Sequence, residues 1–113
     1  TNTNFPNANV VMGTDGNDTI TGTSGSDLIA SFNGTDTVNG LAGNDKILGG
    51  AGVDTLNGGD DNDHIYGYAG ADTLNGNAGN DLIYGGKDND TIDGDAGDDD
   101  LYGEAGDDTL NSG

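Results

Sequence analysis

Aspartate recurs at every ninth residue along most of this chain. From Gly13 to Asn111 the sequence divides into eleven consecutive nonamers without insertion or deletion, and the sixth place of each nonamer is Asp. These residues are Asp18, Asp27, Asp36, Asp45, Asp54, Asp63, Asp72, Asp81, Asp90, Asp99 and Asp108. Stacked carboxylates repel one another unless a cation lies between them, and oxygen atoms are the ligands that hard divalent cations prefer. The spacing therefore indicates a repeated cation site.

The overall charge points to the same kind of partner. The 113 residues carry 21 acidic side chains against Lys46 and Lys87, a formal charge of −19, and no cysteine. Such a chain does not favour nucleic acids or anionic membrane surfaces, and it has no apolar run near the 18 residues of a membrane-spanning helix. Without cysteine, neither disulfides nor thiolate metal sites are available.

The elements that position the aspartates follow from the other places of the nonamer. The eighth place is always aliphatic, whereas the first is Gly except at Ser31 and the fourth is Gly except at Asp61 and Asp88. Side chains of a strand alternate between two faces, so the eighth place faces inward and the seventh and ninth face outward. The glycines permit turns with positive φ, which Asp also tolerates.

A second period of eighteen residues lies within the first. Counting from Gly13, the seventh place of every odd nonamer is Thr, whereas the ninth place of the last three even nonamers is Tyr66, Tyr84 and Tyr102. Odd and even strands therefore face different surroundings. We predict a coil of eighteen residues with two short strands and two glycine-rich turns, stacked so that odd and even strands form separate parallel sheets.

The predicted core is thin. One buried aliphatic side chain contributes roughly 1.5–3 kcal/mol. Ordering the backbone costs about 1–2 kcal/mol for each of the nine residues in a unit. The core therefore does not stabilise the fold alone, and we expect the cations to hold the turns.

The nonamers GGAGVDTLN and GLAGNDKIL match G-G-x-G-x-D-x-U-x, and the register covers about 99 of the 113 residues. The sequence thus resembles the RTX (repeat-in-toxin) calcium-binding nonapeptide repeats. The resemblance implies an all-β fold, a right-handed calcium-bound parallel β-roll of about six coils. It also implies a secreted, extracellular bacterial protein, exported while disordered by type I secretion and folded by extracellular Ca²⁺.

The resemblance further implies where calcium binds. Each ion takes the sixth-place Asp of two successive coils and backbone carbonyls of the turns, which pairs Asp18 with Asp36 and so on along both columns. This gives nine ions, whose charge of +18 nearly cancels −19. Asn9 with Asp27 would form a weaker tenth site. The carbonyl ligands are expected at Gly13, Gly16, Gly22, Gly25, Gly34, Gly40, Gly43, Gly49, Gly52, Gly58, Gly67, Gly70, Gly76, Gly79, Gly85, Gly94, Gly97, Gly103 and Gly106.

Residues 1–12 are predicted to form an edge segment that includes a degenerate first repeat, residues 13–111 the eleven repeats, and residues 112–113 the end. The given sequence ends two residues after the last repeat, where the resemblance leads us to expect a capping segment and a secretion signal. Two explanations stay open: the chain is part of a larger secreted protein, such as a toxin, protease, epimerase, adhesin or surface-layer protein, or it stacks head to tail into a filament.

Other signals are weaker. An EF-hand needs a Glu at the twelfth position of its loop, and the only Glu is Glu104. His64 falls in an outward place without a nucleophile beside it, so we expect no enzyme.

The Tyr66, Tyr84 and Tyr102 face is either an exposed ladder or an interface for adhesion or carbohydrate binding. The threonine face could serve ice binding, but Thr is also simply a good strand residue.

Overall fold

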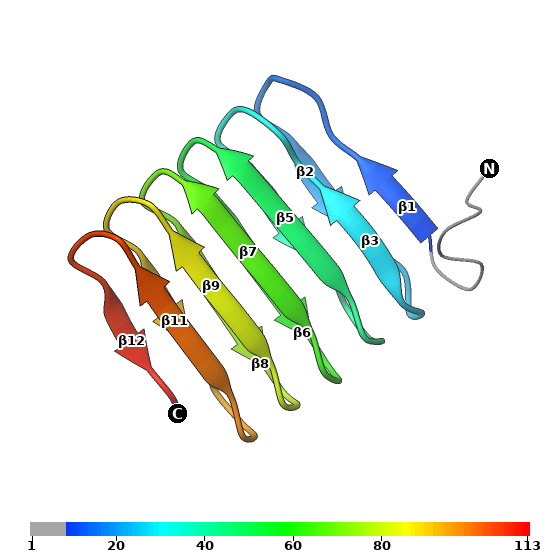
Figure 1. Cartoon of the computed structure of the whole chain (residues 1–113). Coiled ribbons are helices and arrows are strands. Elements are labelled where there is room, and N and C mark those ends of the chain that lie inside the picture. Colours follow the sequence, from blue (N-terminus) through cyan, green and yellow to red (C-terminus); the bar gives the residue numbers. More distant parts are fainter. Residues whose placement is uncertain (1–8) are drawn as a thin grey trace.

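The computed structural model describes residues 9–113, which form twelve short β-strands (Figure 1). One set, the tyrosine sheet, comprises β1 (Asn9–Met12), β3 (Asp27–Ala30), β5 (Lys46–Ala51), β7 (His64–Ala69), β9 (Leu82–Gly86) and β11 (Asp100–Glu104). The other set, the threonine sheet, comprises β2 (Thr19–Thr21), β4 (Thr37–Asn39), β6 (Thr55–Gly59), β8 (Thr73–Asn77), β10 (Thr91–Asp93) and β12 (Thr109–Asn111).

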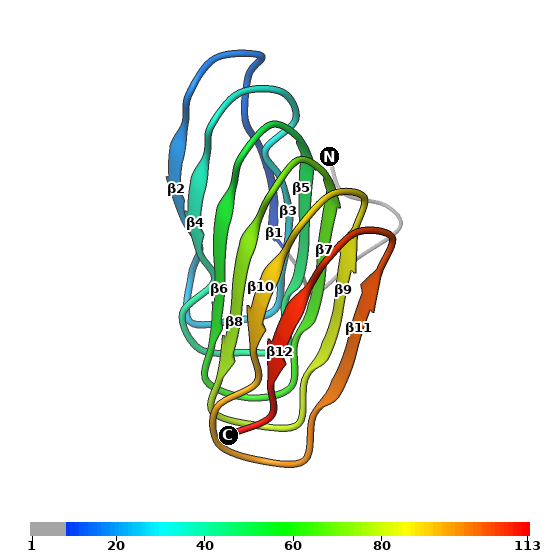
Figure 2. The same ribbon diagram turned by 90° about the vertical axis from the view of Figure 1, so that its left-hand side faces the viewer.

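Each strand pairs in parallel with the strand eighteen residues away. Ile47 lies opposite Ile65 in the tyrosine sheet, and Leu56 lies opposite Leu74 in the threonine sheet. Both sheets have six strands, and the chain crosses from one to the other at every turn. Figure 2 shows the two sheets facing each other along the stack. The predicted all-β roll with eighteen residues per coil and about six coils is confirmed.

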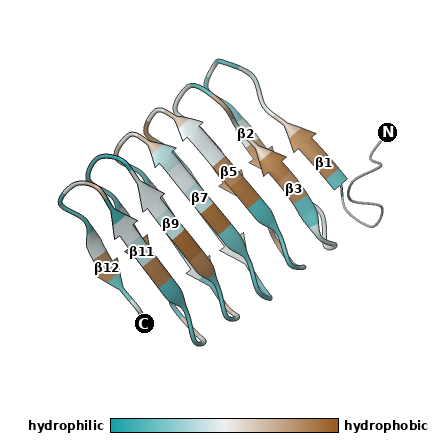
Figure 3. Cartoon of the chain, viewed as in Figure 1, coloured by the Kyte–Doolittle hydropathy of each residue, from teal (hydrophilic) through white to brown (hydrophobic). Residues whose placement is uncertain are grey.

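The core is a single file of eighth-place aliphatic side chains between the sheets, seen as the brown band across the strands in Figure 3. Eight of these side chains are completely buried, namely Ile29, Val38, Ile47, Leu56, Ile65, Leu74, Ile83 and Ile92. Toward the ends Val11 and Leu101 are partly buried, and Leu110 is 44% exposed. Leu110 is more exposed because β12 is the end strand of its sheet and a coil packs on only one of its sides.

The outer faces of the two sheets carry different side-chain ladders. On the tyrosine sheet the rings of Tyr66, Tyr84 and Tyr102 stack with centroids 5.1 and 4.9 Å apart. On the threonine sheet Asn75 Nδ2 donates to Asn57 Oδ1 at 2.8 Å, beside the exposed threonine column. The ring faces inside the tyrosine stack contact one another, so this ladder stabilises itself.

The predicted degenerate first repeat spans residues 4–12, of which 4–8 lie outside the described residues. Its remainder is β1, in which Asn9 lies opposite Asp27 and Val11 opposite Ile29. Val11 packs against the core. β1 thus pairs with β3 at one edge of the tyrosine sheet.

The turns bring the backbones of successive coils close together. Gly70, a fourth-place glycine, has φ of 108°, and a Cβ built there would collide with the carbonyl oxygen of Gly52 one coil earlier. Asp61 and Asp88, which replace Gly at this place, have φ of 76° and 75°. Gly16 holds the same place in the first repeat, but its φ is not positive and a Cβ there would have Thr14 Oγ1 as its nearest neighbour at 3.7 Å.

This difference predicts opposite responses to the same substitution. Gly70→Ala is expected to destabilise the folded protein by at least about 1–3 kcal/mol, since a positive φ and a backbone contact both oppose the new methyl group. The matched variant Gly16→Ala is expected to change the stability by less than about 1 kcal/mol. Denaturant unfolding in saturating calcium measures both, and equal losses would contradict the distinct turn geometries.

Candidate metal centre

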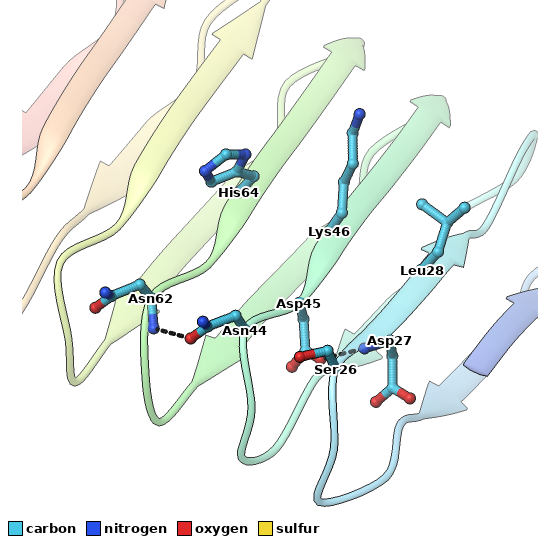
Figure 4. A pocket seen from close by; sticks show the side chains of 8 residues that line it. All are labelled: Ser26, Asp27, Leu28, Asn44, Asp45, Lys46, Asn62 and His64. Carbon is cyan, nitrogen blue, oxygen red and sulfur yellow. Dashed lines mark hydrogen bonds between the residues drawn. The ribbon is translucent and has the colours of Figure 1, made fainter. Parts of the chain in front are cut away.

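Two columns of aspartates run along the stack, one at the start of each sheet's strands. Their side chains point inward, and Asp54 and Asp63 have no exposed surface. The Asp45 backbone N–H donates to Asp63 Oδ1 at 2.8 Å, and the same bond recurs one coil earlier between Asp27 and Asp45 (Figure 4). One carboxylate oxygen of each stacked Asp is therefore fixed by the preceding coil.

The second carboxylate oxygen has no such partner. Within the described residues, eight buried Oδ2 atoms accept no hydrogen bond, those of Asp36, Asp45, Asp54, Asp63, Asp72, Asp81, Asp90 and Asp99. A buried charged oxygen without a partner is strongly unfavourable, and native structures rarely contain one unless a cation or another group compensates it. Eight in regular succession fit a repeated cation site better than a packing defect.

The glycines of the first place keep the space beside each Oδ2 open. A Cβ built on Gly40 would lie 2.6 Å from Asp45 Oδ2 and 2.5 Å from the carbonyl oxygen of Gly58 in the next coil. At Gly67 the corresponding distances to Asp72 Oδ2 and the Gly85 carbonyl are 2.6 and 2.7 Å. At Gly40 and Gly67 a side chain would therefore fill the space between the carboxylate and the next coil's carbonyl.

The predicted ligand residues occupy two sets of positions. First-place glycines lie in the last residues of a strand or directly after it, beside the Oδ2 atoms. From the third repeat on, the fourth-place residues lie in the turns, where each glycine stacks closely on the carbonyl of the same place one coil earlier. The first set therefore lies at the strand ends and the second in the turns.

Three residues depart from the glycine pattern. Ser31 is buried, and its hydroxyl donates to the Gly49 carbonyl at 2.8 Å, which leaves that oxygen one lone pair. Asp61 Oδ2 accepts from the Gly43 backbone N–H at 3.0 Å, and Asp88 Oδ2 accepts from that of Gly70 at 2.9 Å.

The donor set fits calcium. No point within residues 9–113 gathers three or more acidic or histidine side chains, so each site would combine two carboxylates with backbone carbonyls. Ca²⁺ takes six to eight oxygen ligands of these types in flexible geometry. The residues that would hold each ion are the Asp pairs of successive coils and the carbonyls of their turns.

Without a cation, ionisation of the buried aspartate carboxyl groups is unfavourable. Burial raises the pKa of Asp63 and Asp72 to about 8 and that of Asp45 to about 7, and neighbouring carboxylates add to the rise while backbone hydrogen bonds oppose it. Burial likewise raises the pKa of Asp54 and Asp81 to about 6. At neutral pH these shifts favour the protonated form of Asp63 and Asp72, so ionising them in the folded protein without a cation costs stability.

These shifts predict how the calcium-free fold responds to pH. Each raised pKa stabilises the folded state fully below the ordinary value of 3.8, and this stabilisation is lost as the pH rises through about 8. Calcium-depleted protein is therefore expected to show more β-structure by circular dichroism at pH 5 than at pH 8. Added calcium should reduce the difference, and equal β-content at both pH values without calcium would contradict the assignment.

Two site features are absent from the sequence prediction. Thr14 and Thr23 hydrogen-bond to the carboxylates of Asp18 and Asp27 through both backbone N–H and hydroxyl. Both carboxylate oxygens of Asp27 accept bonds from Thr23, while the Asn9 backbone N–H donates to the Ser26 carbonyl. The tenth site between Asn9 and Asp27 stays a prediction without support from these contacts. The sequence feature that could have indicated these threonine hydrogen bonds is Thr in the second place, which occurs only in these two repeats.

The second feature is a column of fifth-place amides. The Oδ1 atoms of Asn44 and Asn62 accept hydrogen bonds from the backbone N–H groups of Asn62 and Asn80 in the next coil, at 2.9 and 2.7 Å. These bonds align successive turns next to the carboxylates. The sequence feature that could have indicated this column is the frequent Asn in the fifth place of the nonamer.

Other chemistry-bearing residues lie away from the columns. In Figure 4 the side chains of Leu28, Lys46 and His64 point away from the carboxylates of Asp27 and Asp45. Lys46 Nζ lies 5.7 Å from the centroid of the Tyr66 ring. Residues 9–113 include no helix that is long and apolar enough to cross a membrane.

Comparison with known proteins agrees with this geometry. The family model of the RTX calcium-binding nonapeptide repeat, which contains four copies of the repeat, matches residues 6–31, 12–47, 31–65, 48–83 and 75–110. The comparisons with curated proteins and with solved structures give no match. The matched segments together span residues 6–110, over stacked turns whose buried carboxylates lack a partner. The chain therefore belongs to the family of RTX calcium-binding nonapeptide repeats.

Proposed function

We propose that this chain is a structural module of a secreted protein that folds when calcium binds between its stacked turns. The observation that carries the proposal is the pair of columns of buried Oδ2 atoms that accept no hydrogen bond. With the ions bound, the turns are cross-linked from coil to coil. Without them, the thin core and the stacked charges favour the unfolded chain.

The site chemistry favours Ca²⁺ over Mg²⁺. The oxygens come from stacked turns whose backbone positions are fixed by the ladder, as in the bond from Asp54 N–H to Asp72 Oδ1 at 2.8 Å. Mg²⁺ demands octahedral geometry and retains several waters, whereas Ca²⁺ accepts irregular shells of carboxylate and carbonyl oxygens. We therefore expect Mg²⁺ to substitute poorly.

Secretion fits a fold that depends on calcium. RTX repeats are typical of secreted proteins. A chain that stays unfolded where calcium is scarce can be exported and then fold where calcium is plentiful. We propose no catalytic role, because the buried aspartates serve as ligands and His64 lies on the outer face of β7.

A calcium titration tests this proposal. Far-UV circular dichroism of calcium-depleted protein is expected to change cooperatively from coil to β-structure when Ca²⁺ is added, and not when the same concentration of Mg²⁺ is added. Full β-structure in excess chelator at pH 8 would contradict the proposal, since the aspartates would then need no cation.

We propose in addition that the β11 and β12 end of the stack receives a coil from a second copy, head to tail. Gly113 already has the geometry of a second-place residue, with φ of 103° and close contact to the Asp95 carbonyl. Open strand edges of this kind pair readily with another chain. Light scattering in saturating calcium is expected to show growth with protein concentration, and a constant monomer would contradict this element of the proposal.

A further inference from the structure

The first two turns of the stack differ from all later ones in their hydrogen bonds. The Thr14 backbone N–H donates to Asp18 Oδ2 at 2.7 Å and its hydroxyl donates to Asp18 Oδ1 at 2.9 Å. Thr23 makes the same two bonds to Asp27, at 2.7 and 2.8 Å. The Oδ2 atoms that lack a partner in the later coils are thus occupied here by a residue of the same turn.

The backbone of these two turns is also different. From the third repeat on, every second-place residue has a positive φ, including Phe32 at 68° and Leu41 at 74°. Thr14 and Thr23 hold the second place in the first two repeats and have no positive φ. The same contrast separates the fourth-place glycines Gly16 and Gly25 from all later residues in that place. A β-branched residue disfavours positive φ, so the threonines account for the change.

We infer that Thr14 and Thr23 close the first two turns in place of calcium. This inference rests on the proposed calcium function and narrows it. The pairs Asp18–Asp36 and Asp27–Asp45 then hold no ion, because the Oδ2 that would face it is already bonded and the turn carbonyls are arranged differently. The pairs that begin with an unbonded Oδ2 number seven, namely Asp36–Asp54, Asp45–Asp63, Asp54–Asp72, Asp63–Asp81, Asp72–Asp90, Asp81–Asp99 and Asp90–Asp108.

The threonine turns have a physical role at the edge of the stack. Within the described residues, no backbone N–H of a preceding coil donates to Oδ1 of Asp18 or Asp27 as Asp45 N–H donates to Asp63, and the Asn9 N–H opposite Asp27 donates to the Ser26 carbonyl instead. The Thr hydroxyl supplies that missing donor, and the Thr backbone N–H satisfies the other oxygen. The turn hydroxyl is itself anchored, because the Gly16 backbone N–H donates to Thr14 Oγ1 at 3.1 Å. The edge coil is thereby complete without a metal.

Native mass spectrometry of the calcium-saturated chain, with circular dichroism to verify folding, tests the inference. The unmodified chain is expected to bind seven ions, and nine would overturn the inference. The double variant Thr14→Gly and Thr23→Gly permits the later turn geometry in both repeats, and it is expected to bind nine ions. A count that stays at seven in this folded variant would also overturn it, since the threonines would not be what excludes the ions.

Two matched double variants distinguish the effect of losing the turn hydroxyls from the general effect of removing two threonines. Thr14→Ser with Thr23→Ser keeps both hydroxyls and is expected to bind seven ions. Thr19→Gly with Thr37→Gly removes two exposed threonines from the outer face and is also expected to bind seven. A rise to nine in either variant would overturn the inference. Binding of no calcium by any of these proteins would instead overturn the proposed function on which the inference rests.

Discussion

Asp63→Asn is expected to remove two calcium ions and to cost about 5 kcal/mol of stability. Asp63 is completely buried and is shared by the proposed sites with Asp45 and Asp81. The side-chain oxygen of asparagine can still accept the hydrogen bond from the Asp45 N–H, as Asp63 Oδ1 does. The substitution removes the negative charge that both proposed sites use. At calcium a hundredfold above Kd, each bound ion contributes about 2.7 kcal/mol, so two lost ions account for the expected change.

The matched control is Asp60→Asn, which changes the net charge equally. Asp60 lies in the exposed turn before Asp63, and its side chain faces solvent. Denaturant unfolding in saturating calcium, together with a count of bound ions, compares the two variants. Equal stability losses would show that net charge matters and that Asp63 is no ligand.

Leu74→Ala is expected to destabilise the calcium-bound protein by about 2.7–5 kcal/mol. Leu74 is completely buried in the single file of core residues, and its neighbours belong to a rigid ladder that cannot collapse into the cavity. The core is one side chain thick, so no second layer compensates for the loss.

Leu110→Ala provides the control, because Leu110 holds the same place of an odd repeat but is 44% exposed. Its loss is expected to stay below about 1 kcal/mol. Calcium-saturated unfolding curves of the two variants give the comparison. Similar losses would contradict a core confined to the interior coils.

Most of the fold follows from the sequence because the repeat has no insertion. A fixed period places the eighth residue of every nonamer in the same environment. The burial of Ile47, Leu56 and Ile65 can therefore be predicted from their position in the repeat alone. The alternation of Thr with other residues in the seventh place separates the two sheets in the same way. Periodicity thus determines the coil length, the sheet assignment and the inward face.

The ends do not follow from periodicity, because a repeat in the sequence does not reveal whether a neighbour covers it. Leu110 and Leu56 hold the same place, yet only Leu56 is buried between two coils. The same limit applies to the site. Asp18 and Asp54 are indistinguishable by spacing, whereas their hydrogen bonds differ because Thr14 lies in the turn of Asp18.

The arrangement links folding to calcium in a simple way. Hydrogen bonds from one coil to the next fix one oxygen of each stacked aspartate, as between Asp36 N–H and Asp54 Oδ1 at 2.9 Å. This leaves the other oxygen facing the turns. The ladder that orders the backbone therefore also assembles the ligands, so strand pairing and ion binding favour each other.

The most direct test of this account is anomalous diffraction from crystals of the calcium-loaded protein. The account predicts anomalous peaks in two columns, each peak between the sixth-place aspartates of successive coils, as between Asp63 and Asp81. Each ion should contact an aspartate Oδ2 atom that accepts no hydrogen bond from the protein. A folded protein whose calcium peaks lie only on the exposed surface, with the aspartate columns free of ions, would contradict it.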